Sequence, residues 1–128
     1  RNIYRTGLID VEVVEYIHNM DQAYLEADLI ISRSGALTVS EISCIGVASI
    51  LIPFPYAVDN HQTKNARYLS RNGAAILIEQ HEINKNKLRK IILNLNSLEL
   101  KKISDKAREL GFENSTKIIS NICEEYMR

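Results

Sequence analysis

The 128-residue sequence has few cysteines and no excess of charge of either sign. Cys44 and Cys123 lack C-x-x-C spacing and have no histidine cluster beside them, so we expect neither a disulfide framework nor a zinc site. Sixteen basic and sixteen acidic residues cancel, so no overall field attracts nucleic acid or an anionic membrane. We expect no nucleic-acid partner and a reducing cytosolic environment.

Long apolar runs and several short motifs are missing as well. No apolar run approaches the length of a membrane span, and no signal peptide opens the sequence. There is no Ser-His-Asp or Cys-His arrangement, no Walker glycine loop and no Asp-x-Asp metal motif. We therefore expect no bound metal and no cofactor.

What the sequence does contain is an alternation of two patterns. Short β-branched runs, mostly apolar on both faces as in a covered parallel sheet, predict strands at 11–17, 27–32, 48–54 and 74–79. Helical patterns predict helices at 20–26, 36–45, 61–71, 84–95, 98–110 and 115–127. Gly46 and Gly73 are placed to cap two of these helices. The alternation predicts a doubly wound, Rossmann-like parallel sheet with flanking helices.

The number of strands is small for this class of fold. In the usual doubly wound order the first strand lies at the centre of the sheet. If that strand precedes this chain, the strand predicted at 11–17 has no neighbour here. We therefore expect the chain to be part of a larger domain.

The stretch SRSGALTVSE, residues 32–41, leaves a predicted strand and enters a predicted helix. Gly35 permits a close approach to the main chain, and the N–H groups of Ala36, Leu37 and Thr38 are free at the start of a helix. The helix dipole favours an anion at this end. A diphosphate would fit there without a metal.

Glu41 follows Thr38 by one turn, about 5 Å along a helix, which is comparable with the step from a nucleotide's phosphates to its ribose. A carboxylate at that place could accept hydrogen bonds from both ribose hydroxyls. The same residues also have a purely structural interpretation, since Thr38–Glu41 matches a capping box and Ser34 is a good N-cap. Their place at the carboxyl end of a strand favours a binding site.

Two further segments should reach the same edge of the sheet. Ile17 ends a predicted strand with a free main-chain N–H and C=O, which could pair with the edge of a uracil ring while Met20 packs against it. Ordinary core packing is the alternative for both residues. Another loop carries Pro53 and Pro55, which hold it extended before the next helix.

His61 and Gln62 begin that next helix and could donate hydrogen bonds to a sugar or a phosphate. The alternative is that Asp59 or Asn60 caps the helix and that His61 is merely exposed. Arg33 has two interpretations as well. It could neutralise phosphate charge, or it could pair with a carboxylate across the turn.

Three stretches together resemble a known family: EYIHNMDQAYLEADLIISRSGALTVSEI, IPFPYAVDNHQTKNARYL and NGAAILIE. They are similar to the C-terminal, donor-binding domain of the bacterial peptidoglycan N-acetylglucosaminyltransferases, closely over 11–79 and more loosely to the end. The resemblance implies that residues 1–128 are part of the C-terminal domain of a GT-B glycosyltransferase, with a C-terminal helix over 112–128. The first strands of that domain and the N-terminal acceptor domain would lie outside this chain.

The resemblance implies UDP-N-acetylglucosamine as the ligand. In that family the main chain at the position of Ile17 contacts uracil. The main-chain amides of residues 36–38 contact the diphosphate, and Glu41 binds the ribose. His61 and Gln62 lie near the sugar and phosphates. The implied binding residues are Ile17, Met20, Arg33, Ser34, Gly35, Ala36, Leu37, Thr38, Glu41, His61 and Gln62.

The implied reaction is the inverting transfer of N-acetylglucosamine to undecaprenyl-diphosphate-linked N-acetylmuramoyl-pentapeptide in peptidoglycan synthesis, which supports cell shape and cell division. The missing Asp-x-Asp motif argues against a metal-dependent transferase. The acceptor site, the membrane contact and the general base would belong to the N-terminal domain. We therefore expect no catalytic residue here, no activity of this chain alone, and a cytoplasmic protein peripheral on the inner membrane.

Two other functions remain open on the sequence. The chain could be a non-catalytic nucleotide-sugar-binding subunit of a split GT-B glycosyltransferase. It could also be a doubly wound signalling or scaffold domain in which residues 34–41 are only a capping motif.

Overall fold

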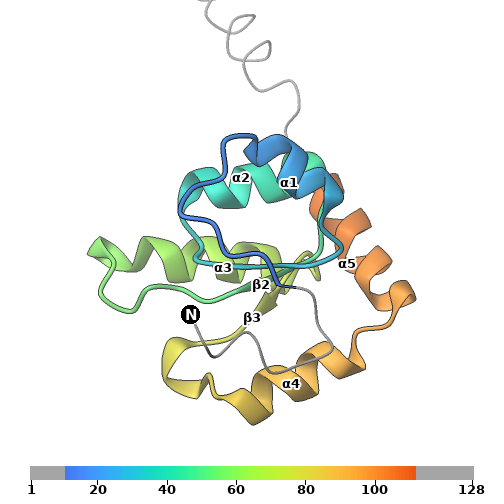
Figure 1. Cartoon of the computed structure of the whole chain (residues 1–128). Helices are drawn as coiled ribbons and strands as arrows, with labels where there is room; N and C mark the ends of the chain where they lie inside the picture. Colours follow the sequence, from blue (N-terminus) through green and yellow to red (C-terminus); the bar gives the residue numbers. More distant parts are fainter. Residues whose placement is uncertain (1–10, 112–128) are drawn as a thin grey trace, which may run out of the picture.

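The computed structural model describes residues 11–111 (Figure 1). The elements, in chain order, are α1 (Met20–Glu26), β1 (Ile30–Ser32), α2 (Ala36–Ile45), β2 (Ser49–Leu51), the 3-10 turn η2 (Val58–Asn60), α3 (His61–Arg71), β3 (Ile76–Leu77), the 3-10 turn η3 (Gln80–Glu82), α4 (Lys85–Asn94) and α5 (Ser97–Glu109). The predicted bounds of the first three helices are confirmed. The helix predicted at 115–127, like the C-terminal helix expected over 112–128, lies outside the described residues.

The strands β1, β2 and β3 form one parallel sheet in that order. Ile31 of β1 pairs with Ile50 of β2, and Leu51 of β2 pairs with Leu77 of β3. The crossovers between neighbouring strands are the helices α2 and α3, which pack against each other. Because parallel strands end at the same edge, the loops after β1 and β2 meet there, and the predicted Rossmann-like α/β fold is confirmed.

Residues 11–17 do not form the strand that was predicted. Their backbone has no strand pairing, and Val13 and Tyr16 are 69% and 72% exposed. A strand is stabilised by a hydrogen-bonded neighbour, and none of the residues 11–111 provides one for this segment. The other three strands are shorter than predicted, because only the residues that pair with a neighbouring strand are strand, and the apolar pattern in the sequence extends beyond those paired residues.

The core lies between the sheet and the helices α2, α3 and α5. Ile42, Leu51 and Leu69 have no exposed surface, and Ala107 of α5 completes this cluster. Gly46 ends α2 with φ 72°, and its N–H bonds to the carbonyl of Ile42 at 2.9 Å. The predicted glycine cap is therefore confirmed at this helix, because only glycine adopts that conformation without strain.

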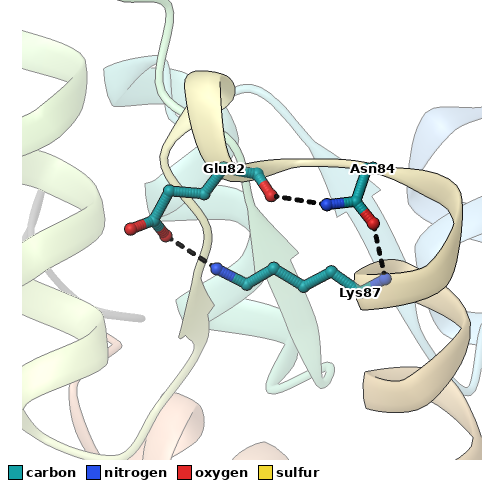
Figure 2. A network of polar contacts seen from close by, with 3 residues as sticks. All are labelled: Glu82, Asn84 and Lys87. Atoms are coloured by element: carbon teal, nitrogen blue, oxygen red, sulfur yellow. Dashed lines mark hydrogen bonds and ion pairs between the residues drawn. The ribbon is translucent and has the colours of Figure 1, made fainter.

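The start of α4 shows how a local motif sets a helix boundary (Figure 2). The Asn84 side chain accepts a hydrogen bond from the Lys87 N–H at 2.9 Å, and its amide reaches the Glu82 carbonyl at 3.4 Å. The Lys87 ammonium lies 2.7 Å from the Glu82 carboxylate, and this hydrogen bond and charge lower the pKa of Glu82. Asn84 is thus the N-cap, and the predicted helix is confirmed to within one residue at each end.

Candidate functional site

The loop after β1 is joined to the start of α3 by two partly buried hydrogen bonds. Ser34 has no exposed surface, and its hydroxyl donates to the Gln62 carbonyl at 2.7 Å. The Asn65 side-chain amide donates to the Ser34 carbonyl at 3.1 Å. The two bonds fix the N-terminus of α2 relative to that of α3, at the carboxyl edge of the sheet.

The N-terminus of α2 has no side-chain cap. Gly35 occupies the N-cap position with φ −60° and ψ 154°, and the first main-chain bond of the helix runs from Val39 N–H to the Gly35 carbonyl at 3.0 Å. The N–H groups of residues 36–38 precede that bond and therefore have no partner within the helix. Both Ala36 and Leu37 are exposed. Open main-chain donors and the positive end of the helix dipole coincide here.

The capping interpretation of this stretch is wrong. Ser34 makes no cap bond because its hydroxyl is committed to the Gln62 carbonyl, 28 residues away. Thr38 lies inside the helix, so it cannot be the first residue of a capping box. A Cβ added to Gly35 would meet Thr38 Oγ1 at 3.8 Å, an ordinary van der Waals contact, so the turn itself is not tightly packed.

Glu41 is oriented by a residue that the sequence did not indicate. The Tyr24 hydroxyl donates to Glu41 Oε2 at 2.9 Å, and the tyrosine is 7% exposed in the core between α1 and α2. Burial, and then the hydrogen bond and charge of Glu41, raise the pKa of Tyr24 to about 12. The hydroxyl is therefore a protonated donor throughout the physiological range. The Glu41 carboxylate stays on the exposed side of α2.

The segment before α1 presents apolar side chains to solvent. Ile17 is 41% exposed and Met20, the first residue of α1, is 39% exposed. Within residues 11–111, neither residue is buried in the core. Exposed apolar side chains suit an aromatic ligand, but the assignment of Ile17 and Met20 to uracil stays a prediction.

Gln62 is fixed with its amide nitrogen available. Its Oε1 accepts a hydrogen bond from the Phe54 N–H at 2.9 Å. Because a main-chain N–H can bond only to the carbonyl oxygen of the side chain, the NH₂ group is left as a donor. His61 is exposed, with Nε2 3.9 Å from Asp59 Oδ2. Whether these two residues meet a sugar or phosphate stays a prediction.

In the predicted alternative for the start of α3, the side-chain cap is wrong, whereas His61 is exposed as that alternative expected. Asn60 occupies the N-cap position, but no side chain makes the cap hydrogen bond. Asp59 and Asn60 instead have positive φ values of 51° and 55°, a conformation that these two residue types tolerate. They shape the turn that leads into the helix, and α3 therefore also begins without a side-chain cap.

Arg33 binds main-chain oxygens and not a carboxylate. Its guanidinium donates to the carbonyls of Ile52 and Pro53 at 3.2 and 3.1 Å and lies 5.6 Å from the centre of the Phe54 ring. Within residues 11–111 no carboxylate pairs with it, so the ion-pair alternative is wrong. The chain leaves the sheet at these carbonyls, and an arginine has enough donors to satisfy both. A phosphate contact by Arg33 stays a prediction.

The described residues therefore form a Rossmann-like parallel sheet with an uncapped helix N-terminus and an oriented carboxylate after its first strand. Residues 1–122 match the model of the glycosyltransferase family 28 C-terminal domain, and the chain belongs to that family. The fold is that of the C-terminal domain of a GT-B glycosyltransferase.

Two similar proteins are named as N-acetylglucosamine transferases. The UDP-N-acetylglucosamine–N-acetylmuramyl-(pentapeptide) pyrophosphoryl-undecaprenol N-acetylglucosamine transferase of Cupriavidus pinatubonensis is 41% identical over 125 residues, which are 98% of this chain and 35% of that protein. The protein of the same name from Nitrosospira multiformis is 43% identical over 120 residues, 94% of this chain and 34% of its own length.

A solved structure agrees. The crystal structure of Acinetobacter baumannii MurG matches with a TM-score of 0.85 at 38% identity, covering 91% of this chain and 35% of that one. This chain therefore spans about a third of the length of the relatives that it matches. Among the helices at 11–111, none is long and apolar enough to cross a membrane.

Proposed function

We propose that the protein carrying this chain transfers N-acetylglucosamine from UDP-N-acetylglucosamine to undecaprenyl-diphosphate-linked N-acetylmuramoyl-pentapeptide, and that this chain supplies donor binding. The family match and the names of the relatives support the reaction. Residues 1–128 would be part of the C-terminal domain, with the first strands of that domain and the acceptor domain elsewhere in the protein.

The observation that carries the proposal is the uncapped start of α2 beside an oriented carboxylate. The N–H groups of residues 36–38 would bind the diphosphate, because they have no partner within the helix and lie at its positive end. Glu41, held by Tyr24, would accept hydrogen bonds from the ribose hydroxyls. Gln62 would donate its free NH₂ group to the sugar or phosphates.

The chemistry assigned to this chain is stabilisation of the leaving group. The 4-hydroxyl of the muramyl acceptor attacks the anomeric carbon, the bond from that carbon to the UDP oxygen breaks, and the configuration inverts. Both electrons of the broken bond leave with UDP, so negative charge grows on the diphosphate. The start of α2 would stabilise that charge. The proton of the attacking hydroxyl would pass to a general base in the N-terminal domain, and this chain alone would not turn over.

The proposed biological setting follows from the acceptor. A lipid-linked acceptor requires contact with the membrane surface, which we assign to the N-terminal domain on the cytoplasmic face of the inner membrane. The product would feed cell-wall synthesis and through it cell shape and division. A separate, non-catalytic donor-binding subunit is not favoured, because the relatives extend well beyond the matched third in the same polypeptide.

Calorimetry with UDP on the full-length protein tests this proposal. Binding should occur without magnesium, and Glu41→Ala should weaken it by about 1–3 kcal/mol because the hydroxyls lose their acceptor. Glu109→Ala, an exposed glutamate at the end of α5, is the matched control and should bind UDP like the wild type. Unchanged affinity in Glu41→Ala would remove Glu41 from the site. If UDP gave no heat of binding in calorimetry and no change in melting temperature, the domain would be a scaffold and the proposal would fail.

A further inference from the structure

The hydrogen bond between Tyr24 and Glu41 joins two neighbouring helices of the candidate site. Tyr24 belongs to α1 and Glu41 to α2, and these helices lie side by side (Figure 1). We propose that Tyr24 is a positioning residue, which holds the Glu41 carboxylate in the orientation that accepts the sugar hydroxyls of a nucleotide and so sets the preference for ligands that carry them. This inference rests on the proposed donor site.

Glu41 needs an external restraint to serve as a fixed acceptor. It lies on the exposed side of α2, and its carboxylate is separated from the helix by three rotatable bonds. Ordering a glutamate side chain is among the more costly losses of side-chain freedom. Within residues 11–111 the Tyr24 hydroxyl is the single group that hydrogen-bonds the carboxylate. A carboxylate ordered before the ligand arrives binds it more tightly, because less freedom is lost on binding.

Tyr24 is suited to that role because it is itself held by the core. The residue is 7% exposed and belongs to the same cluster as Ile42 and Leu51, which have no exposed surface. A tyrosine has only two side-chain torsions, so a packed ring also fixes its hydroxyl. The high pKa of Tyr24 keeps the proton on that hydroxyl at the pH at which the protein works.

The same bond determines what the carboxylate can recognise. Tyr24 donates to Oε2, while Oε1 has no partner among the described residues. An ionised carboxylate only accepts hydrogen bonds, so its open positions require donors such as hydroxyls and repel phosphate oxygens. Phosphates would therefore remain at the start of α2 and the sugar hydroxyls at Glu41. Met20 lies four residues before Tyr24, on the same face of α1, so one short helix would align the base with the ribose acceptor.

The test is a cycle of ligand and protein changes in the full-length protein. UDP and 2′,3′-dideoxyuridine diphosphate are titrated by calorimetry into the wild type, Tyr24→Phe, Glu41→Ala and the double variant. The wild type should prefer UDP by about tenfold or more. Tyr24→Phe, which keeps the ring, should bind UDP about three- to tenfold more weakly and the dideoxy ligand unchanged, since only the hydroxyl contact needs the oriented carboxylate.

The double variant separates positioning from folding. If Tyr24 acts through Glu41, then adding Tyr24→Phe to Glu41→Ala should change UDP affinity no further. Tyr68→Phe is the matched control, because Tyr68 is 50% exposed and its hydroxyl makes no hydrogen bond to the described residues. It should behave as the wild type with both ligands.

The outcomes that overturn the inference are distinct from failure of the proposed function. A wild type that does not bind UDP would refute the donor site itself. A wild type that binds UDP and the dideoxy ligand equally would retain the donor site but overturn this inference. Equal losses for both ligands in Tyr24→Phe, no loss for either, or a variant that does not fold would also overturn it, because the hydroxyl would then have a general structural role or none.

Discussion

Replacing Ala36 by proline would delete one main-chain donor of the candidate site and little else. Ala36 is the first residue of α2, where the helix makes no use of the N–H group and where proline is well tolerated. The preceding Gly35 has φ −60° and ψ 154°, an extended conformation of the kind that a residue before proline requires. The Ala36 side chain is exposed, so the ring meets no packed neighbour.

The expected magnitudes separate folding from binding. Proline at a compatible position reduces the freedom of the unfolded chain and stabilises by about 0.4–1 kcal/mol. A hydrogen bond from an N–H group to a charged phosphate contributes about 1.5–3 kcal/mol. Ala36→Pro should therefore be at least as stable as the wild type but bind UDP about 10- to 100-fold more weakly.

Calorimetry on the full-length protein checks this, with uridine as a second ligand. Because uridine carries no phosphate, Ala36→Pro should leave its affinity unchanged. Ser97→Pro is the matched control, since Ser97 is the exposed first residue of α5 and follows an extended Asn96 with ψ 171°. If Ala36→Pro folded and bound UDP as tightly as the wild type, the diphosphate would not lie on these donors.

Two further predictions concern stability. Ser34→Ala should lower the free energy of unfolding by about 1–3 kcal/mol, measured in urea, because the Gln62 carbonyl loses its donor, whereas the exposed Ser40→Ala should cost little. The folded pKa of Tyr24 lies above its ordinary value of 10.0, so the folded state holds that proton more tightly than the unfolded state. This stabilisation is complete below about pH 10 and is lost as the pH rises towards about 12, by at most roughly 2–3 kcal/mol. Denaturation curves of Tyr24→Phe should lack that loss, and an identical alkaline decline would contradict the assignment.

The helices were the most predictable part of this fold. The bounds of α1, α2 and α3 follow from patterns within a few residues, such as the turn that ends at Gly46. The strand predicted at 11–17 failed because pairing is not a local property. Its apolar pattern is typical of a strand, but no described residue supplies the neighbour that would satisfy its backbone.

The site was predictable in place but not in its internal bonds. The sequence indicated the edge after β1 because ligands of α/β sheets gather there. It did not show that the Ser34 hydroxyl would hydrogen-bond to a carbonyl 28 residues away and not to the start of its own helix. Nor did it show that Tyr24 would reach Glu41 across 17 residues, since a lone tyrosine on a short helix is most simply interpreted as core.

Because the N-terminus of α2 has no side-chain cap, its main-chain N–H groups also determine how an inhibitor of such a site could lose potency. Every amino acid except proline carries the same peptide N–H, so an inhibitor that engages these groups depends very little on side-chain identity. Apart from proline at position 36, resistance would have to come from shielding. Gly35, where an added Cβ would meet only Thr38 Oγ1 at 3.8 Å, is where a new side chain could shield these groups. The natural substrate would meet the same obstruction, so escape of this kind should carry a cost in growth.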